Sequence, residues 1–251
     1  MKCRFFYFKT PRLQAESTIG KLKKMNAAIL VAAGRGIRMG AGTDKLFLEV
    51  AGRPVVAHTW QIFNDTKCID EIILVVRDGM QPVFEKLAKK FRLEKKFQLV
   101  GGGAERQDSV WNGLEALPPK VKIVAVQDAA RPCTSATLIT ATIEAARETG
   151  AAVAAQALTD TIKESGDGKT ILRTLDRSKL WSVQTPQTFR VEIIRRAIST
   201  ARQKNLVFTD DTAACELIGQ PVRLVPGATP NPKVTVPGDL PFIEALLRNQ
   251  F

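Results

Sequence analysis

From Asn26 onward the chain alternates short apolar runs with longer amphipathic stretches, and this alternation limits its possible folds more than any other feature. The run AAILVA at 27–32 is typical of a buried strand, and a helix is predicted to begin at Pro54. Similar strand patterns follow at 72–76, 97–100, 121–127, 151–158 and 222–225. Further helices are expected near 81–91, 110–117, 135–149, 191–204, 211–218 and 237–247.

Strands that alternate with helices favour one architecture. Because βαβ crossovers are right-handed, such a chain is predicted to form a Rossmann-like α/β fold, an open, mostly parallel sheet with helices on both faces. Ligands of these sheets bind at the carboxyl ends of the strands. The residues that follow each predicted strand are therefore the candidates for function.

Residues 159–180 interrupt the alternation. Polar and apolar residues alternate there around Gly166-Asp167-Gly168, which is the pattern of a hairpin. We expect this segment to leave the main sheet as a protruding β-arm.

The positive charge is distributed unevenly along the chain. Residues 1–24 hold seven lysines and arginines against one glutamate, a charge of +6 that is half of the formal net charge of +12. We expect residues 1–24 to be a disordered basic extension and residues 25–251 to form a single domain. A targeting or anion-binding arm is the alternative for the first 24 residues, and a nucleic-acid-binding protein led by this basic tail is the alternative for the whole chain.

Composition excludes several classes of protein. No stretch approaches the roughly 18 uninterrupted apolar residues of a membrane span, so no membrane role is expected. The four cysteines lie far apart with no C-x-x-C pair, which suggests neither zinc nor disulfides and fits a cytoplasmic protein. His58 is the only histidine, so catalysis is expected to use carboxylates, lysines, arginines and backbone amides.

A glycine-rich loop follows the first predicted strand. The sequence AAGRGIRMG at 32–40, followed by Lys45, combines exposed backbone amides with fixed positive charge, which suits a triphosphate. The segment lacks the Gly-Lys-Ser/Thr of a Walker loop, and its glycine spacing fails the dinucleotide-binding pattern. An ordinary strand-to-helix turn is the alternative.

Two further loops follow predicted strands. Asp128 comes directly after the buried run 121–127, where a carboxylate is well placed to hold a Mg²⁺ ion that also binds phosphate oxygens; a turn or helix cap before Pro132 is the alternative. Gly101-Gly102-Gly103 permits a flat base to approach the backbone, while Ser109 either contacts the ligand or caps the next helix. Lys233 alone would be an ordinary surface charge.

Taken together, the motifs of residues 26–249 resemble the 2-C-methyl-D-erythritol 4-phosphate cytidylyltransferase family. The resemblance rests on short motifs in a fixed order: A-A-G-x-G-x-R-M at 32–39, Lys45, G-G-x-x-R-x-x-S-V at 102–110, D-A-A-R-P at 128–132, D-T-I-K at 160–163, D-R-x-x-L-W at 176–181, T-P-Q at 185–187, T-D-D at 209–211 and N-P-K-V-T at 231–235. It implies transfer of CMP from CTP to a sugar-alcohol phosphate, with release of pyrophosphate and a need for Mg²⁺.

The resemblance also implies roles for individual residues. Arg38 and Lys45 match catalytic cations, Asp128 matches the magnesium ligand, and the set that contacts CTP comprises Ala32, Ala33, Gly34, Gly103, Ala104, Ser109 and Ala129. The residues that bind or enclose the acceptor would be Thr161, Arg177, Thr209 and Lys233.

In this family the segment 159–180 crosses to a second subunit, so the resemblance implies a homodimer in which Thr161 and Arg177 complete the partner's site. A cytidylyltransferase for ribitol 5-phosphate, which shares the same loops, is the nearest alternative.

Overall fold

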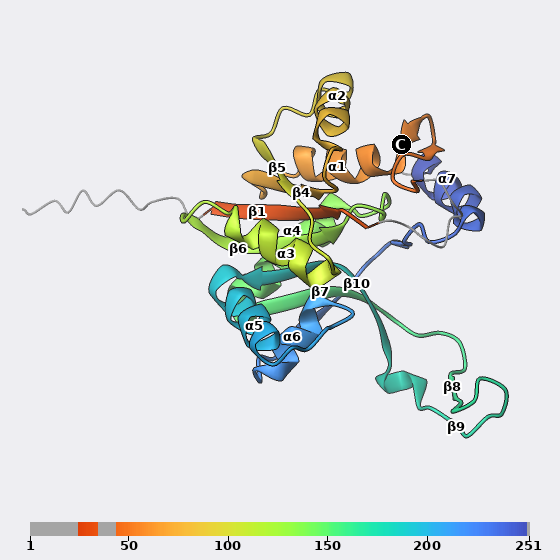
Figure 1. Ribbon diagram of the computed structural model, residues 1–251. Coiled ribbons are helices and arrows are strands. Elements are labelled where there is room, and N and C mark those ends of the chain that lie inside the picture. The colour runs from red at the N-terminus through yellow and green to blue at the C-terminus, as the bar shows by residue number, and fades with distance from the viewer. Residues whose placement is uncertain (1–24, 35–43, 250–251) are drawn as a thin grey trace, which may run out of the picture.

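The computed structural model describes residues 25–34 and 44–249, and one seven-stranded sheet dominates it (Figure 1). The strand order is β11-β7-β10-β6-β1-β4-β5. The strands are β1 (Met25–Ala32), β4 (Glu71–Val76), β5 (Phe97–Gly101), β6 (Val121–Asp128), β7 (Ala151–Ala157), β10 (Trp181–Arg190) and β11 (Arg223–Pro226). The strands predicted from the sequence are all present, each within about two residues of its expected bounds.

The sheet is mostly parallel. β1 pairs in parallel with β4 on one side and β6 on the other, whereas β10 runs antiparallel to both β6 and β7. The chain continues from β1 to β4 and β5 in one direction and returns to place β6 on the opposite side of β1. This reversal makes the carboxyl ends of β1 and β6 the natural place for a ligand.

Helices cover both faces of the sheet, as the sequence predicts (Figure 1). Two separate clusters of buried side chains define the faces. One cluster includes side chains from α1 (Val55–Asp65), α2 (Gln81–Phe91), α4 (Ala136–Thr149) and α7 (Leu240–Arg248). The other includes side chains from α3 (Arg106–Glu115), α5 (Val191–Gln203) and α6 (Asp211–Leu217). The predicted fold class is confirmed.

The side-chain period of strand β1 explains the two clusters. Ala28 and Leu30 pack into the cluster beneath α1, while Ala27 and Ile29 pack into the cluster beneath α3. Because successive side chains of a strand point to opposite faces, a central strand with helices on both sides is apolar throughout.

Strand β10 is the one strand of the main sheet that the sequence did not predict. Its ten residues, WSVQTPQTFR, include Pro186 and several polar side chains, so they lack the apolar run of the other central strands. The register of β10 shifts between Val183 and Gln187, on either side of the proline. The strand therefore accommodates a residue that cannot donate a hydrogen bond.

The segment 159–180 projects from the body of the molecule (Figure 1). It contains the two-residue strands β8 (Lys163–Glu164) and β9 (Arg173–Thr174), which pair antiparallel, and a 3₁₀ helix at Arg177–Lys179. Gly168 at the turn has a φ of +69°, a conformation that glycine adopts readily. The predicted hairpin is confirmed.

Two smaller elements complete the fold. The short strands β2 (Glu49–Val50) and β3 (Arg53–Pro54) form a hairpin before α1, and a 3₁₀ turn at Pro237–Asp239 leads into α7. The last helix therefore begins three residues later than the sequence predicted. Within 25–34 and 44–249, no helix is long and apolar enough to cross a membrane.

Candidate active site

A cavity of about 670 Å³ opens at the carboxyl ends of β1 and β6. The register of the sheet explains its position, because Val31 of β1 lies opposite Asp128 of β6 and Ala129 N–H donates to Val31 O at 3.1 Å. The predicted site residues that line this cavity are Ala33, Gly34, Lys45, Gly103, Ala104, Ser109, Asp128, Ala129 and Lys233. One pocket thus collects side chains from loops far apart in the sequence.

On one side of the cavity, the described start of the first glycine loop, at Ala33 and Gly34, lies next to the second glycine loop. A Cβ atom added at Gly102 would come within 2.4 Å of the Ala33 Cβ, and Gly102 N–H donates to Val76 O at 2.8 Å. Glycine is therefore required at 102 by close packing. Gly34 differs, because a Cβ there would meet nothing within 4 Å. The absence of a side chain at Gly34 leaves backbone exposed to the cavity.

The start of α3 fixes the second loop. Gly103 N–H donates to Ser109 Oγ at 3.1 Å, and Glu105 N–H donates to Asp108 Oδ2 at 3.2 Å. Because Ser109 Oγ holds the loop from within the helix, this residue both organises the loop and lines the cavity.

Asp128 lies among three basic side chains. Its Oδ2 is 2.7 Å from Lys233 Nζ and 3.8 Å from Arg131 Nε, and its Oδ1 is 3.4 Å from Arg106 Nε. The Asp128 side chain is only 12% exposed. Arg106 also pairs with Asp211, whose Oδ2 lies 2.8 Å from Arg106 Nη1.

These contacts set the charge of Asp128. Burial alone would raise the pKa of this carboxyl group, but the nearby charges of Arg106, Lys233 and Arg131 outweigh burial and lower the pKa to about 2. Asp128 is therefore ionised at neutral pH and presents a negative charge to the cavity that it lines.

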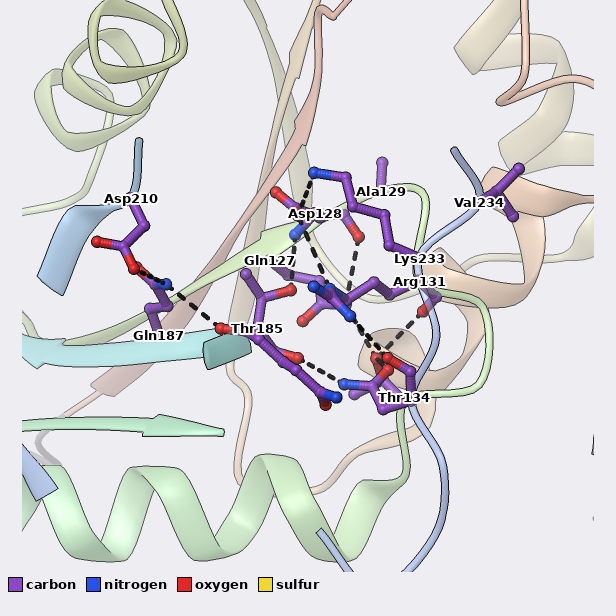
Figure 2. A network of polar contacts seen from close by, with 12 residues as sticks. Gln127, Asp128, Ala129, Arg131, Thr134, Thr185, Gln187, Asp210, Lys233 and Val234 are labelled. Carbon is purple, nitrogen blue, oxygen red and sulfur yellow. Dashed lines mark hydrogen bonds and ion pairs between the residues drawn. The ribbon is translucent and has the colours of Figure 1, made fainter. Parts of the chain in front are cut away.

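The segment 231–235 is held across the end of β6. Figure 2 shows Lys233 reaching toward Asp128, with Arg131, Thr134 and Thr185 grouped around the same loop. Arg131 Nη1 donates to Asn231 O at 2.7 Å, and Asn231 Nδ2 donates to Thr185 O at 2.8 Å. These bonds place Lys233, which looks like a surface charge in the sequence, inside the cavity.

Lys45 also contacts this segment. Its Nζ donates to Val234 O at 2.9 Å, while Val234 N–H donates to Ala130 O at 2.8 Å. The neighbouring Asp44 forms an ion pair with Arg77 and accepts a hydrogen bond from Leu46 N–H. The predicted catalytic cation Arg38 lies outside the described residues.

Four predicted site residues do not line the cavity. Ala32 is buried in the core next to it. Thr161, Arg177 and Thr209 are exposed, and Arg177 Nη1 donates to Thr159 O within the projecting arm. Thr209 lies between α5 and α6, two residues before the Asp211 that pairs with Arg106.

The structure also places residues in the site to which sequence reasoning gave no role. Arg106 and Glu105 line the cavity, and Arg131 donates a hydrogen bond to Asn231 O. Arg106 and Arg131 both occur within motifs used for the family resemblance, so their position in those motifs was the available signal. Their partners, Asp211 and Asn231, are about one hundred residues away in the chain and could not be paired from sequence.

An open α/β sheet with glycine loops, cavity-lining lysines and an ionised aspartate at its carboxyl edge defines a protein that binds a nucleotide through its phosphates. The family model for 2-C-methyl-D-erythritol 4-phosphate cytidylyltransferase (IspD) matches residues 26–249. The chain therefore belongs to this family, and the resemblance seen in the sequence is confirmed.

Individual relatives agree with the family match. The chain is 44% identical over 223 residues to 2-C-methyl-D-erythritol 4-phosphate cytidylyltransferase of Pelotomaculum thermopropionicum, covering 88% of this chain and 94% of that protein. It is 46% identical over 221 residues to the bifunctional enzyme IspD/IspF of Desulforudis audaxviator, and the match covers 88% of this chain but 56% of that longer enzyme.

A solved structure supports the same assignment. The chain superimposes on 4-diphosphocytidyl-2C-methyl-D-erythritol synthase of Anaerococcus prevotii with a TM-score of 0.79 at 31% identity, covering 90% of this chain and 96% of that one.

Proposed function

We propose that this chain transfers CMP from CTP to 2-C-methyl-D-erythritol 4-phosphate, forming 4-diphosphocytidyl-2-C-methyl-D-erythritol and pyrophosphate. The observation that carries the proposal is the single cavity that unites both glycine loops with Lys45, Asp128 and Lys233. Family membership, with near full-length relatives of this name, supports the choice of reaction.

The CTP half of the site is built from backbone. The backbone of Gly34 is open to the phosphates, and the loop at 103–104, held by Ser109, offers backbone to the base. Binding through main-chain atoms needs no large side chains, in agreement with a cavity lined by glycine and alanine at these positions.

The chemistry requires position and charge. In the proposed reaction a phosphate oxygen of the acceptor attacks the α-phosphorus of CTP, a bond to that phosphorus forms, and the bond to the pyrophosphate oxygen breaks. Negative charge grows on the phosphoryl oxygens, so Lys45 and Lys233 serve as fixed cations that stabilise it. The acceptor phosphate is already ionised at neutral pH, which explains why a cavity without histidine suffices.

The residues of the cavity fit a Mg²⁺ ion bound together with CTP. Mg²⁺ is usually held by one or two carboxylates plus substrate phosphates, and Asp128 supplies an ionised carboxylate with Glu105 also lining the cavity. Among the described residues, Asp128 Oδ1 has one long contact, of 3.4 Å to Arg106 Nε, so this oxygen retains capacity to accept a ligand. When bound, the ion would neutralise triphosphate charge. Among residues 25–34 and 44–249 no cluster of three or more His, Cys, Asp or Glu side chains forms a metal site without substrate.

The acceptor half of the site is proposed to involve a second copy of the chain. Thr161 and Arg177 belong to the arm 159–180, which projects from the body of the molecule (Figure 1), and neither residue lines the cavity. Apolar side chains on the arm are exposed, with Ile171 at 61% and Leu172 at 66%. Contact with a second subunit would bury them and would carry Arg177 to the partner's cavity.

Turnover with defined substrates tests the proposal. Purified protein is mixed with Mg²⁺, one of the four nucleoside triphosphates and either 2-C-methyl-D-erythritol 4-phosphate or ribitol 5-phosphate, and pyrophosphate release is measured. We expect release only with CTP and the methylerythritol phosphate. Efficient use of ribitol 5-phosphate, which family membership does not favour, would overturn the assignment of the acceptor.

A further inference from the structure

The segment 206–211, which contains most of the connection between α5 and α6 and the first residue of α6, lies against the first turn of α3. The Gln107 side chain makes two hydrogen bonds to the backbone of this segment. Its Nε2 donates to Leu206 O at 3.1 Å, and its Oε1 accepts from Phe208 N–H at 3.2 Å. The Gln107 amide group therefore binds the backbone on both sides of Val207.

The other end of the segment is held by different groups. Asp211 Oδ2 lies 2.8 Å from Arg106 Nη1, and Asp211 N–H donates to Gln187 Oε1 at 2.9 Å. Arg106 and Gln107 are adjacent on α3, and both follow the loop that lines the cavity. Two consecutive side chains thus bind the two ends of one segment, with Thr209 between them.

Burial does little to fix the first half of this segment. Val207 is 66% exposed and Leu206 is 39% exposed, while Phe208 packs only partly against the core. Apolar contact is therefore a weak restraint on 206–207, and the two bonds from Gln107 supply a directional one. A glutamine amide suits this task because it offers a donor and an acceptor at once, which a glutamate does not.

We propose that Gln107 is a positioning residue for the acceptor: it holds 206–208 against α3 and so fixes Thr209, which lies between this segment and Asp211, the partner of the cavity-lining Arg106. The inference rests on the proposed function and on the acceptor role that the family resemblance implies for Thr209. It predicts that Gln107 affects the acceptor through Thr209 and leaves CTP binding alone.

The first test replaces Gln107 by a side chain of similar length without the amide. For Gln107→Met we expect about a tenfold rise in the KM for 2-C-methyl-D-erythritol 4-phosphate, a kcat within about twofold of wild type and an unchanged Kd for CTP. The matched control is Gln61→Met, because Gln61 on α1 donates to the exposed Asp65 of the same helix and does not line the cavity. The control should leave all three values unchanged. An unchanged acceptor KM for Gln107→Met, or an equal loss of CTP affinity, would overturn the proposal.

A double-mutant cycle separates positioning from a general structural role. If Gln107 acts through Thr209, then adding Gln107→Met to Thr209→Val should lower kcat/KM for the acceptor no more than about twofold further. Additive losses would refute the proposal even if both single variants were impaired. Thermal unfolding of each variant identifies any that fail to fold, and Gln107→Asn, which keeps the amide on a shorter side chain, should show an intermediate KM.

The outcome also distinguishes this inference from the proposed function. Failure of the wild-type protein to turn over CTP with the methylerythritol phosphate would reject the function itself. Normal wild-type turnover with unaltered Gln107→Met kinetics would reject only the role of Gln107.

Discussion

The cavity and the projecting arm both contain ion pairs, but the two regions use them differently. Around Asp128 the charges are largely shielded from water, with the Asp128 side chain 12% exposed and Asp211 2% exposed. On the arm, the pair between Arg173 and Glu164 joins side chains that are 70% and 42% exposed. Charge interactions are strong where water is excluded and weak where it is not.

The cavity is organised by contacts within one chain, whereas the arm is proposed to need a second chain for its function. Contacts within the chain hold three side chains in the same cavity, those of Lys45, Asp128 and Lys233. Arg177 is exposed on the arm and donates a hydrogen bond to Thr159 O within the same arm, so its place in a site depends on what the arm contacts. The comparison predicts large effects in the cavity and partner-dependent or small effects on the arm.

Lys45→Ala is the change expected to have the largest effect. Loss of a preorganised cation that stabilises the transition state costs about 2 to 4 kcal/mol, which corresponds to a fall in kcat of about 30- to 1,000-fold. The Kd for CTP, measured by calorimetry, should change much less. Lys86→Ala on the exposed side of α2 is the control. Turnover at the wild-type rate would remove Lys45 from the mechanism.

Mixing two variants, one changed in the cavity and one in the arm, tests whether the arm of one subunit completes the cavity of another. Lys45→Ala damages the cavity, and Arg177→Ala damages the arm. If arms exchange between subunits, a mixed dimer contains one site with both residues intact, so random mixing after mild unfolding and refolding should restore about a quarter of wild-type activity. No gain on mixing would contradict arm exchange, and sedimentation of each variant controls for loss of the dimer.

Acidification should lower the stability of the folded protein through Asp128, whereas changes of pH near neutrality should not. The pKa of Asp128 is about 2, below the ordinary value of 3.8, because its basic neighbours outweigh burial. The ionised carboxylate therefore stabilises the folded state above pH 3.8, and this contribution, about 2 kcal/mol, is lost as the pH falls toward 2. Urea unfolding of wild type and Asp128→Asn from pH 6 to pH 2 should show a difference that narrows by this amount. A constant difference would show that the charge of Asp128 is not coupled to folding.

The smallest effect is expected for the exposed pair on the arm. Arg173→Ala should change the free energy of unfolding by less than about 0.5 kcal/mol, because an exposed pair is screened by water and salt. Thermal unfolding at low and high salt measures it. A loss above about 1 kcal/mol would mean that Arg173 makes contacts beyond this pair, for instance in a dimer.

Residues close in sequence were the predictable part of this molecule. Local sequence patterns predict the apolar strand β1, the glycines after it and the position of Asp128 at the end of β6. The rule that ligands bind at the carboxyl ends of strands then predicts that these features form one site. The fold class and most of the cavity follow from such local patterns.

Pairings over long distances were not predictable. Strand β10 was not predicted because Pro186 and the polar residues around it do not form a strand pattern. Its position in the sheet depends on pairing with β6 and β7 on either side. In the same way, nothing near Arg106 indicates that Asp211 will neutralise it, and Lys233 gains its role only through its contact with Asp128. These features depend on tertiary contacts rather than on any window of sequence.

The bond from Lys45 to Val234 O spans 189 positions of the chain. During synthesis on the ribosome, Lys45 emerges long before the segment that carries Lys233, so a growing chain has its glycine loops well before the cavity has its second lysine. Contacts of such wide separation form late and slowly. Catalytic competence should consequently arise only after residues 231–235 have been translated and have joined Asp128 and Lys45.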